Sequence, residues 1–194
     1  LVLDEADKML SLGFSEELAQ VLAALPKKRQ NLLFSATFPP ELEQLIASLL
    51  HNPVGINLAK QDENLIEQHV YTLEAERKNA ALIHLIKTGD WQQVLVFASA
   101  KNTCNRLVLK LEKAGIQAAA FHGDLSQSAR NNALADFKAK HIRVLIATDV
   151  AARGIDIQQL PYVVNFDLPR SANDYIHRIG RTGRAGNQGL AFSL

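Results

Sequence analysis

Three acidic side chains stand close together in the segment Asp4-Glu5-Ala6-Asp7, directly after the apolar residues 1–3. In open α/β sheets, ligands bind at the carboxyl ends of strands, where such a segment would lie. Carboxylates at that position could hold Mg²⁺ through water and orient a water molecule for attack on a phosphoryl group. An exposed acidic turn that leads into a helix has the same appearance, so this pattern alone leaves both interpretations open.

A second cluster of reactive side chains is basic and lies in the segment His177–Arg184, which reads HRIGRTGR. Arg181 and Arg184 are three residues apart, so a helical turn or a tight loop would place both guanidinium groups on one side. Arginine donates hydrogen bonds in a rigid fork that suits phosphate, and the intervening glycines allow a close backbone approach. The last 54 residues contain six arginines and no lysine, a bias that a merely solubilising basic patch does not need. We therefore predict phosphate recognition in this segment.

Two further polar segments follow predicted strands. Ser35-Ala36-Thr37 could bond to the neighbouring carboxylates, although serine and threonine are also common helix caps. Thr148 and the segment Asp149–Asp156 follow the apolar residues 144–147. Small residues there would let the backbone approach a ligand, and burying so many polar groups without a partner would be costly. We predict a functional role for the second segment, whereas the first segment taken alone is more typical of a helix cap.

Weaker signals come from helix starts and strand ends elsewhere in the chain. Gln127 and Arg130 open a predicted helix shortly after Gly123, and a helix N-terminus beside an arginine can bind phosphate. Ordinary capping explains that pattern equally well, and Ser99, after the apolar residues 94–97, is similarly ambiguous. The histidines show no metal-ligand spacing, so no zinc site is expected. The chain contains no G-x-x-x-x-G-K-[ST] loop to cradle the phosphates of a nucleotide.

The elements that must position these residues alternate along the chain. Short apolar, β-branched runs alternate with helical patterns, which predicts parallel βαβ units and an α/β fold with a doubly wound parallel sheet. The predicted strands are 1–3, 31–34, 54–58, 68–73, 93–98, 117–121, 143–147, 162–165 and 189–192. The predicted helices are 15–24, 40–50, 75–87, 102–114, 126–139 and 171–178. Gly115 follows one of these helices, where a left-handed C-cap is expected.

A polar, aperiodic stretch at residues 59–67 is the predicted linker between two domains. Three predicted strands precede it and six follow it. Six strands with their helices complete a doubly wound domain at residues 68–194. A parallel sheet needs both of its faces covered, so we expect residues 1–58 to be the second part of a domain whose first part lies outside this sequence.

Composition places few limits on function. The 194 residues are 47% hydrophobic and 21% charged, with a formal net charge of +1, which does not by itself indicate nucleic-acid binding. The single cysteine, Cys104, excludes an internal disulfide and fits a reducing compartment. No apolar run approaches the roughly 18 residues of a membrane-spanning helix. We expect a cytoplasmic protein that is monomeric.

Taken in order, these segments resemble the motifs of the DEAD-box RNA helicases, a branch of superfamily 2. The matching segments, similar to motifs II, III, IV, the QxxR element, V and VI, are Asp4–Asp7, Ser35–Thr37, Val94–Ser99, Gln127 with Arg130, Ala147–Asp156 and His177–Arg184. Lys28–Phe38 and Ala147–Ile157 look like the bacterial RhlE-like branch. The resemblance implies RecA-like domains on both sides of the linker. Residues 1–58 would be the C-terminal part of the ATP-binding domain, and residues 68–194 the helicase C-terminal domain.

The resemblance implies a role for each matching residue at the nucleotide. Asp4 would coordinate Mg²⁺ through water, and Glu5 would orient the attacking water. Asp156 would accept a hydrogen bond from the ribose of ATP. Arg181 and Arg184 would reach the γ-phosphate as arginine fingers.

It further implies RNA contacts and residues that link them to ATP. Asp7, with the hydroxyls of Ser35 and Thr37, would couple the state of the ATP to RNA binding, and His177 would join the network between domains. RNA phosphates and sugars would be contacted without sequence preference. The residues implied in these contacts are Ser99, Gly123, Gln127, Arg130, Thr148 and Arg153.

The expected function is therefore RNA-stimulated ATP hydrolysis coupled to local unwinding of short RNA duplexes, with partners in ribosome assembly or RNA decay. The chain alone is expected to be inactive, because it has no phosphate loop. Two alternatives remain: an RNA-binding module without catalysis, and a DNA-directed superfamily 2 translocase. The residues Ala6 and Asp7, and the sequence HRIGRTGR, favour an RNA substrate over a DNA substrate.

Overall fold

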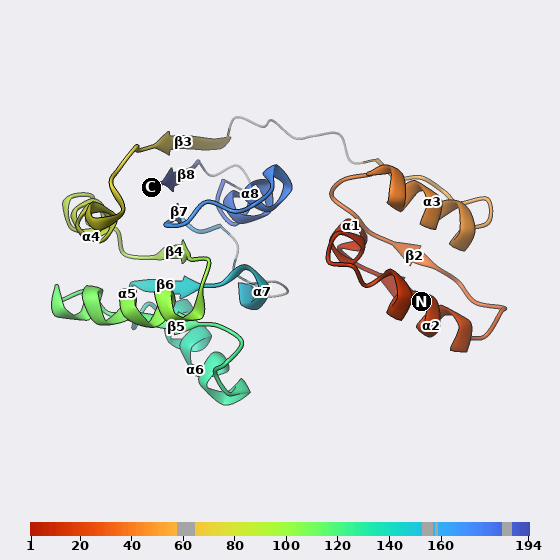
Figure 1. Ribbon diagram of the computed structural model, residues 1–194, viewed down its shortest axis with the longest axis horizontal. Coiled ribbons are helices and arrows are strands. Elements are labelled where there is room, and N and C mark those ends of the chain that lie inside the picture. Colours follow the sequence, from red (N-terminus) through yellow and green to blue (C-terminus); the bar gives the residue numbers. More distant parts are fainter. Residues whose placement is uncertain (58–64, 153–156, 158, 184–187) are drawn as a thin grey trace. The chain divides into compact units, whose positions relative to one another are not determined.

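The structure is a computed structural model that describes residues 1–57, 65–152, 157, 159–183 and 188–194. The chain splits into two compact units, Leu1–Ala59 and Lys60–Leu194 (Figure 1). Among the described residues, no helix combines the length and the apolar character needed to cross a membrane.

The first unit is a small α/β layer built on two parallel strands. Its elements are β1 (Val2–Leu3), α1 (Ala6–Ser11), α2 (Ser15–Ala24), β2 (Leu32–Leu33) and α3 (Pro40–Leu49). Val2 pairs with Leu32 and Leu3 with Leu33. A core of Leu3, Leu18 and Leu49 holds the helices against the strands. The carboxyl ends of β1 and β2 therefore lie side by side, which brings the residues after each strand together.

In this unit, sequence analysis missed one helix and wrongly predicted one strand. The six-residue helix α1 begins inside the acidic segment and is too short to show a helical repeat in the sequence. The strand predicted at 54–58 is not formed by the described residues 54–57. Val54 and Ile56 are 88% and 82% exposed, so their β-branched side chains have no neighbouring strand or core to pack against.

The second unit is a six-stranded sheet in which every pairing is parallel, so the predicted α/β fold is confirmed. The strand order is β3-β8-β7-β4-β6-β5, visible from top to bottom in Figure 1. The strands are β3 (Ile66–Val70), β4 (Val94–Phe97), β5 (Ala118–Phe121), β6 (Val144–Ala147), β7 (Tyr162–Asn165) and β8 (Gly189–Ser193). The helices are η2 (Ala75–Arg77, a 3₁₀ turn), α4 (Lys78–Thr88), α5 (Lys101–Lys113), α6 (Gln127–Lys138), α7 (Asp149–Ala152) and α8 (Ala172–Ile179).

Sequence analysis misplaced one element of this unit and missed another. Strand β3 begins at Ile66, inside the predicted linker, and ends at Val70 rather than at residue 73. It lies at the edge of the sheet, where pairing with β8 on one side tolerates the polar residues that suggested a linker. Helix α7 was not predicted, because four residues are too few to show a helical repeat. Gly115 has the predicted left-handed backbone, with φ +78°.

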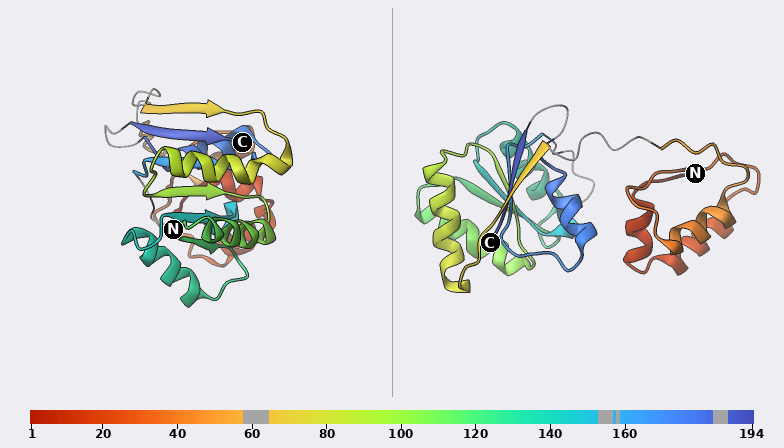
Figure 2. Two further views of the ribbon diagram at one scale, coloured as in Figure 1. Left: turned by 90° about the vertical axis from the view of Figure 1, so that its left-hand side faces the viewer. Right: turned by 90° about the horizontal axis from the view of Figure 1, so that it is seen from above.

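Side chains alternate across the sheet and fill two separate cores. Val94 and Val96 pack with buried residues of α4 and α5, whereas Leu95 and Phe97 pack with those of α6 and α7. Figure 2, in the view from above, shows α4 on one side of the edge-on sheet and α8 on the other. Both faces of the sheet are therefore covered, which matches the continuous apolar runs of its central strands.

The register of the strands aligns their carboxyl ends at one edge. Phe97 at the end of β4 pairs with Ala147 of β6 and with Asn165 of β7, and Ala147 also pairs with Phe121 of β5. The residues that follow these strands must then lie along the same border of the sheet, which we call the strand-end edge. They include Ser99, Gly123, Thr148, Asp149 and Asp167.

Candidate functional site

The acidic segment lies at the carboxyl end of β1. Asp4 is exposed and Glu5 is half-buried, whereas Asp7 is buried in the first turn of α1. The Glu5 N–H donates to Asp4 Oδ1 at 2.9 Å, and the Ala6 N–H donates to the carbonyl of Phe34 at 3.1 Å. The Ala6 bond anchors the segment to the end of β2, and the first two carboxylates lie on the less buried side.

The hydroxyls of the Ser35–Thr37 segment contact this acidic segment, as the sequence suggested. Thr37 Oγ1 donates to Asp7 Oδ2 at 2.5 Å, and Ser35 Oγ accepts from the Asp7 N–H at 3.2 Å. Ser35 Oγ also donates to the carbonyl of Thr37 at 2.8 Å, which holds the segment in a tight turn. Asp7 is thus bound to the end of β2, whereas the described hydrogen bonds tie Asp4 only to the adjacent backbone.

The residues present fit Mg²⁺ in the way that nucleotide-bound Mg²⁺ is usually held. Such an ion keeps several waters and takes one or two carboxylates plus substrate phosphates. The exposed Asp4 carboxylate can supply that contact. Within the described ranges, no group of three or more His, Cys, Asp or Glu side chains could hold a metal by itself. A magnesium ion here would depend on Asp4, water and the nucleotide together.

Glu5 adopts a left-handed backbone conformation, with φ 48° and ψ 44°, at the N-cap of α1. A residue with a Cβ atom pays roughly 1–2 kcal/mol to occupy this region. Because the neighbouring N–H groups of Glu5 and Ala6 are both bonded, the turn cannot easily relax. The strain lies at a residue with a carboxylate, in the segment where chemistry is expected.

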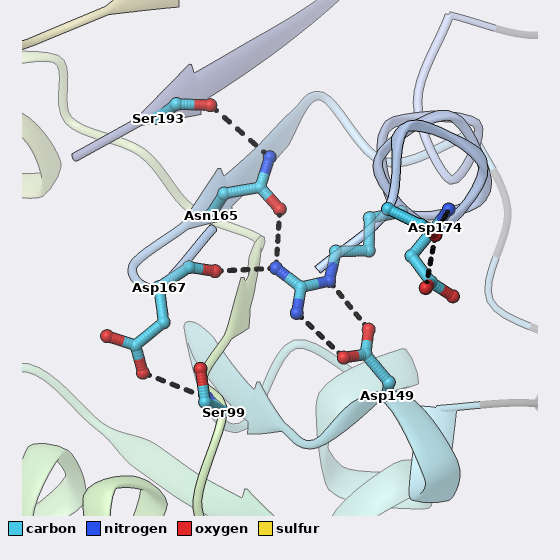
Figure 3. A network of polar contacts seen from close by, with 8 residues as sticks. Ser99, Asp149, Asn165, Asp167, Asp174 and Ser193 are labelled. Carbon is cyan, nitrogen blue, oxygen red and sulfur yellow. Dashed lines mark hydrogen bonds and ion pairs between the residues drawn. The ribbon is translucent and has the colours of Figure 1, made fainter. Parts of the chain in front are cut away.

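In the second unit, the main feature of the strand-end edge is one buried guanidinium group, which sequence reasoning missed. Arg178 of α8 is 2% exposed. Its Nε and Nη2 donate to the two carboxylate oxygens of Asp149, at 2.6 and 2.7 Å. Its Nη1 donates to Asn165 Oδ1 at 3.0 Å and to the carbonyl of Asp167 at 2.6 Å (Figure 3). All three guanidinium nitrogens are therefore bonded.

The same network continues to two further strand ends. The Ser99 N–H donates to Asp167 Oδ2 at 2.8 Å, and Asn165 Nδ2 donates to Ser193 Oγ at 3.4 Å. Figure 3 shows these residues around the end of the guanidinium side chain. The carboxyl ends of β4, β6, β7 and β8 are thus joined to α8 through one arginine. No pattern in the sequence links residues so far apart. The only signal for this network was that Ser99 and Asp149 both follow predicted strands.

A buried arginine is tolerated here because its charge is matched. The bidentate pair with Asp149 combines two charge-assisted hydrogen bonds in a fixed geometry. The guanidinium also lies 5.1 Å from the centre of the Phe97 ring, within the range of a cation–π contact. Removal of Asp149 would leave the buried guanidinium uncompensated, whereas removal of Arg178 would leave a carboxylate that is partly exposed.

Comparison with known proteins supports the resemblance over the whole chain. The family model described as "DEAD/DEAH box helicase" matches residues 1–45, and the "Helicase conserved C-terminal domain" model matches residues 77–186. This chain belongs to the DEAD-box RNA helicase family.

Curated relatives of this DEAD-box chain come from several kingdoms. The whole chain is 42% identical to the ATP-dependent RNA helicase DBP3 of Meyerozyma guilliermondii, over 37% of that protein. It is equally identical to the ATP-dependent RNA helicase RhlB of Pseudomonas syringae, over 50% of that protein. Among the first relatives, the chain spans between 25% and 50% of their length.

Solved structures of DEAD-box proteins are also similar to this chain. Dbp5 of S. cerevisiae, bound to RNA and ADP BeF3, has a TM-score of 0.86 and 37% identity, covering 99% of this chain and 52% of that one. A DEAD box protein from Methanococcus jannaschii has a TM-score of 0.65 and 42% identity, covering 99% and 52%. The RecA-like helicase fold expected from the sequence is therefore confirmed.

Motif VI of this DEAD-box chain is described only up to Gly183. His177 and Arg181 are half-buried and flank Arg178 on α8 and just after it. Gly183 has φ +61°, and a Cβ atom there would lie 2.9 Å from the carbonyl oxygen of Leu65. At least this glycine is required by packing against the start of β3, rather than only by a ligand. The predicted site residues Arg153, Asp156 and Arg184 lie outside the described residues.

The predicted RNA-contact residues that are described fall into two groups. Ser99, Gly123 and Thr148 all lie at the strand-end edge. Gln127 and Arg130 lie at the start of α6, where Arg130 Nη2 donates to Gln127 Oε1 at 2.6 Å. Ser126 caps the helix by accepting from the Ala129 N–H at 3.2 Å. Capping is therefore performed by a different residue from the QxxR pair.

A charged pair joins the first residue of α5 to the loop that follows β5. Lys101 Nζ lies 2.5 Å from Asp124 Oδ1, next to Gly123. This hydrogen bond lowers the pKa of the Asp124 carboxyl below its usual value. Both side chains are exposed to solvent, so this ion pair has no large effect on stability.

The strain at Glu5 gives a testable prediction. Replacement by glycine should leave the chain about 1 kcal/mol more stable than replacement by alanine, because only glycine occupies the left-handed region without penalty. Gln20, exposed in the middle of the regular helix α2, is the matched control. There the order should reverse, with alanine about 1 kcal/mol better than glycine. Denaturant unfolding of the four variants decides, and the same order at both positions would contradict the strain.

The Arg178 network gives a second prediction. Arg178→Met should lower the free energy of unfolding by about 2–3 kcal/mol, just below the range for a fully buried pair, because Asp149 is partly exposed. Arg106→Met, on the exposed face of α5, should change it by less than about 0.5 kcal/mol. Chemical denaturation measures both. Equal small effects would show that the network does not stabilise this unit.

Proposed function

We propose that this chain is part of an ATP-dependent RNA helicase, in which RNA stimulates ATP hydrolysis and hydrolysis is coupled to local unwinding of short duplexes. The observation that carries the proposal is the bonding of Asp7 to Thr37 and Ser35. It fixes the acidic segment at a strand end, with Asp4 and Glu5 next to it. Membership of the DEAD-box family and the Dbp5 structure with RNA and ADP BeF3 support the same activity.

The proposed roles at the nucleotide follow from charge and position. Asp4 would hold Mg²⁺ through water, and Glu5 would orient the attacking water. The ion supplies charge neutralisation at the phosphates when it is bound. Arg181 and Arg184 would donate to the γ-phosphate as charge develops on its oxygens, and Asp156 would accept from the ribose.

The proposed RNA site is the strand-end edge of residues 68–194, which we take as the helicase C-terminal domain, with residues 1–58 as part of the ATP-binding domain. Ser99, Gly123 and Thr148 would contact RNA phosphates and sugars there, together with Gln127, Arg130 and Arg153. Backbone N–H groups and hydroxyls contact phosphate and sugar without reading bases, so binding would tolerate any sequence. Asp7, Ser35, Thr37 and His177 would link RNA binding to the state of the ATP.

Further proposals concern the setting of the helicase. The segments Lys28–Phe38 and Ala147–Ile157 support the bacterial RhlE-like branch, although RhlB and eukaryotic helicases match the chain as well. We propose a cytoplasmic, monomeric enzyme that works on RNA in ribosome assembly or RNA decay. Reconstruction of the family tree from full-length sequences tests the branch assignment.

Arg181→Lys tests the arginine-finger role. In the full-length enzyme, this variant should lose most RNA-stimulated ATPase activity, at least a hundredfold, because lysine keeps the charge but not the bidentate fork. Arg170→Lys, at an exposed position before α8, is the matched control and should keep normal turnover. Steady-state phosphate release measures both. Near-normal turnover by Arg181→Lys would contradict the arginine-finger role of Arg181.

A second candidate function, RNA binding without catalysis, is favoured for the 194-residue chain taken alone. The chain contains no G-x-x-x-x-G-K-[ST] sequence, and this loop supplies the backbone N–H groups and the lysine that hold nucleotide phosphates. We therefore expect weak RNA binding and no ATP turnover from this chain. Measurement of phosphate release with RNA decides, and clear turnover would contradict the expectation.

A further inference from the structure

We propose that the exposed face of helix α5 is an additional RNA-binding surface, which holds the phosphates of an RNA strand that extends beyond the strand-end edge. The proposal rests on the proposed function and extends the RNA site away from that edge. The surface is a row of three exposed basic side chains, Arg106, Lys110 and Lys113, which we call the α5 basic stripe.

The helical repeat places the members of the stripe on one side of α5. Residues three or four positions apart are neighbours on a helix surface, so Lys110 lies between Arg106 and Lys113. Leu107 and Leu111 are buried on the other side of the helix, in the core against the sheet. The stripe spans about 10 Å along the helix axis at 1.5 Å per residue. Its three side chains can therefore reach separate phosphates of one strand.

The charge of the stripe is not balanced within α5. Like charges three or four positions apart on a helix repel each other. The only acidic residue of α5, Glu112, has no basic residue at either of these spacings. Among the described residues, no ion pair includes a member of the stripe.

The helix dipole explains only part of the stripe. It favours cations in the last turn, where Lys110 and Lys113 lie, but Arg106 stands before that turn. A bound anion would relieve the repulsion along the whole row. Charge complementarity therefore favours a ligand that carries a series of negative charges, as an RNA backbone does.

Helix α5 also continues the edge at which RNA is proposed to bind. It begins at Lys101, two residues after Ser99. Lys101 is bonded to Asp124, next to Gly123, so the start of the helix is tied to a second proposed RNA contact. Strands β4 and β5 are both parallel to β6, so α5 must run from this edge back toward the other end of the sheet. A strand that leaves the edge over α5 would meet the stripe residues one after another.

Proximity to the edge favours RNA over an acidic protein as the occupant. An RNA strand that is already held at the edge is present beside α5 at a high effective concentration, so weak contacts are enough to bind its extension. Leu109, which is 59% exposed, lies next to Lys110 and adds apolar surface that a ribose or a base can cover. Nothing in the described structure tethers an acidic protein to this face.

The test uses the full-length protein and a triple variant, Arg106→Gln, Lys110→Gln and Lys113→Gln. RNA affinity is measured over a series of salt concentrations with single strands of about ten and about twenty nucleotides. The variant should bind the longer RNA at least about fivefold more weakly at low salt. Its slope of log affinity against log salt should fall by about two, because each phosphate contact on a single strand contributes about 0.7. The affinity for the shorter RNA should stay within about twofold, since that RNA is held at the edge.

Two control variants separate the stripe from general effects of charge. Exchange of arginine for lysine and of lysine for arginine at the three stripe positions keeps the charge, so binding of both RNAs should be retained. Lys27→Gln, Lys28→Gln and Lys140→Gln together remove three exposed charges elsewhere. Since distant surface charges are screened by salt, this variant should bind the longer RNA within about twofold of the unmodified protein. All variants should keep the melting temperature, because every changed position is exposed.

Four outcomes would contradict the proposal. Equal losses for the two RNAs would show that the stripe belongs to the edge site and holds no extension. An unchanged salt slope with the longer RNA would show that the stripe contacts no phosphates, which would leave an acidic protein as the better occupant. An equal loss in the Lys27, Lys28 and Lys140 variant would show an effect of net charge alone. Absence of RNA binding by the unmodified protein would instead overturn the proposed function itself, and the α5 proposal with it.

Discussion

The arrangement of the second unit depends on a single ion pair, the fork between the buried Arg178 and the partly exposed Asp149. A parallel sheet places its strand ends at one edge but does not fix the loops that follow them. The guanidinium group performs that task, because it bonds to residues after β6 and β7 and reaches β4 through Asp167. The segments of Ser99 and Thr148, which are proposed to contact RNA, are thereby fixed relative to helix α8.

The first unit uses the same logic with different chemistry. There the side-chain carboxylate of Asp7 accepts a hydrogen bond from the hydroxyl of Thr37, and the backbone N–H of Asp7 donates to Ser35 Oγ. These bonds fasten the acidic segment to the neighbouring strand, and they leave the strained turn at Glu5 to direct its carboxylate. In both units, a buried polar group fixes a loop and the adjacent, more exposed residues are the candidates for chemistry.

Much of this organisation could be predicted from residue patterns. Helix α2 and strand β7 have the predicted bounds, because Ser15 and two acidic residues mark the start of the helix and a short β-branched run marks the strand. Helices α1 and α7 were missed, since a helix of one or two turns has no repeat to detect. Strand β3 was placed too late, because an edge strand needs few apolar residues.

The candidate site was predictable only where chemistry is local. The acidic segment, the hydroxyl segment and the arginine segment each show their residue types in a few consecutive positions. The Arg178 network has no such signature, because its members are separated along the chain and meet only after the sheet has formed. Asp167 and Asn165 look like ordinary loop and strand residues in the sequence. Their partners follow from register, which the sequence does not specify residue by residue.

The most direct test of the central claim is a side-by-side measurement of ATP hydrolysis by the full-length protein with RNA and with DNA of the same base sequence. We expect strong stimulation by RNA, whatever its sequence, and little stimulation by DNA. Equal stimulation by both, or no dependence on nucleic acid, would contradict the assignment of this chain to an RNA-stimulated ATPase.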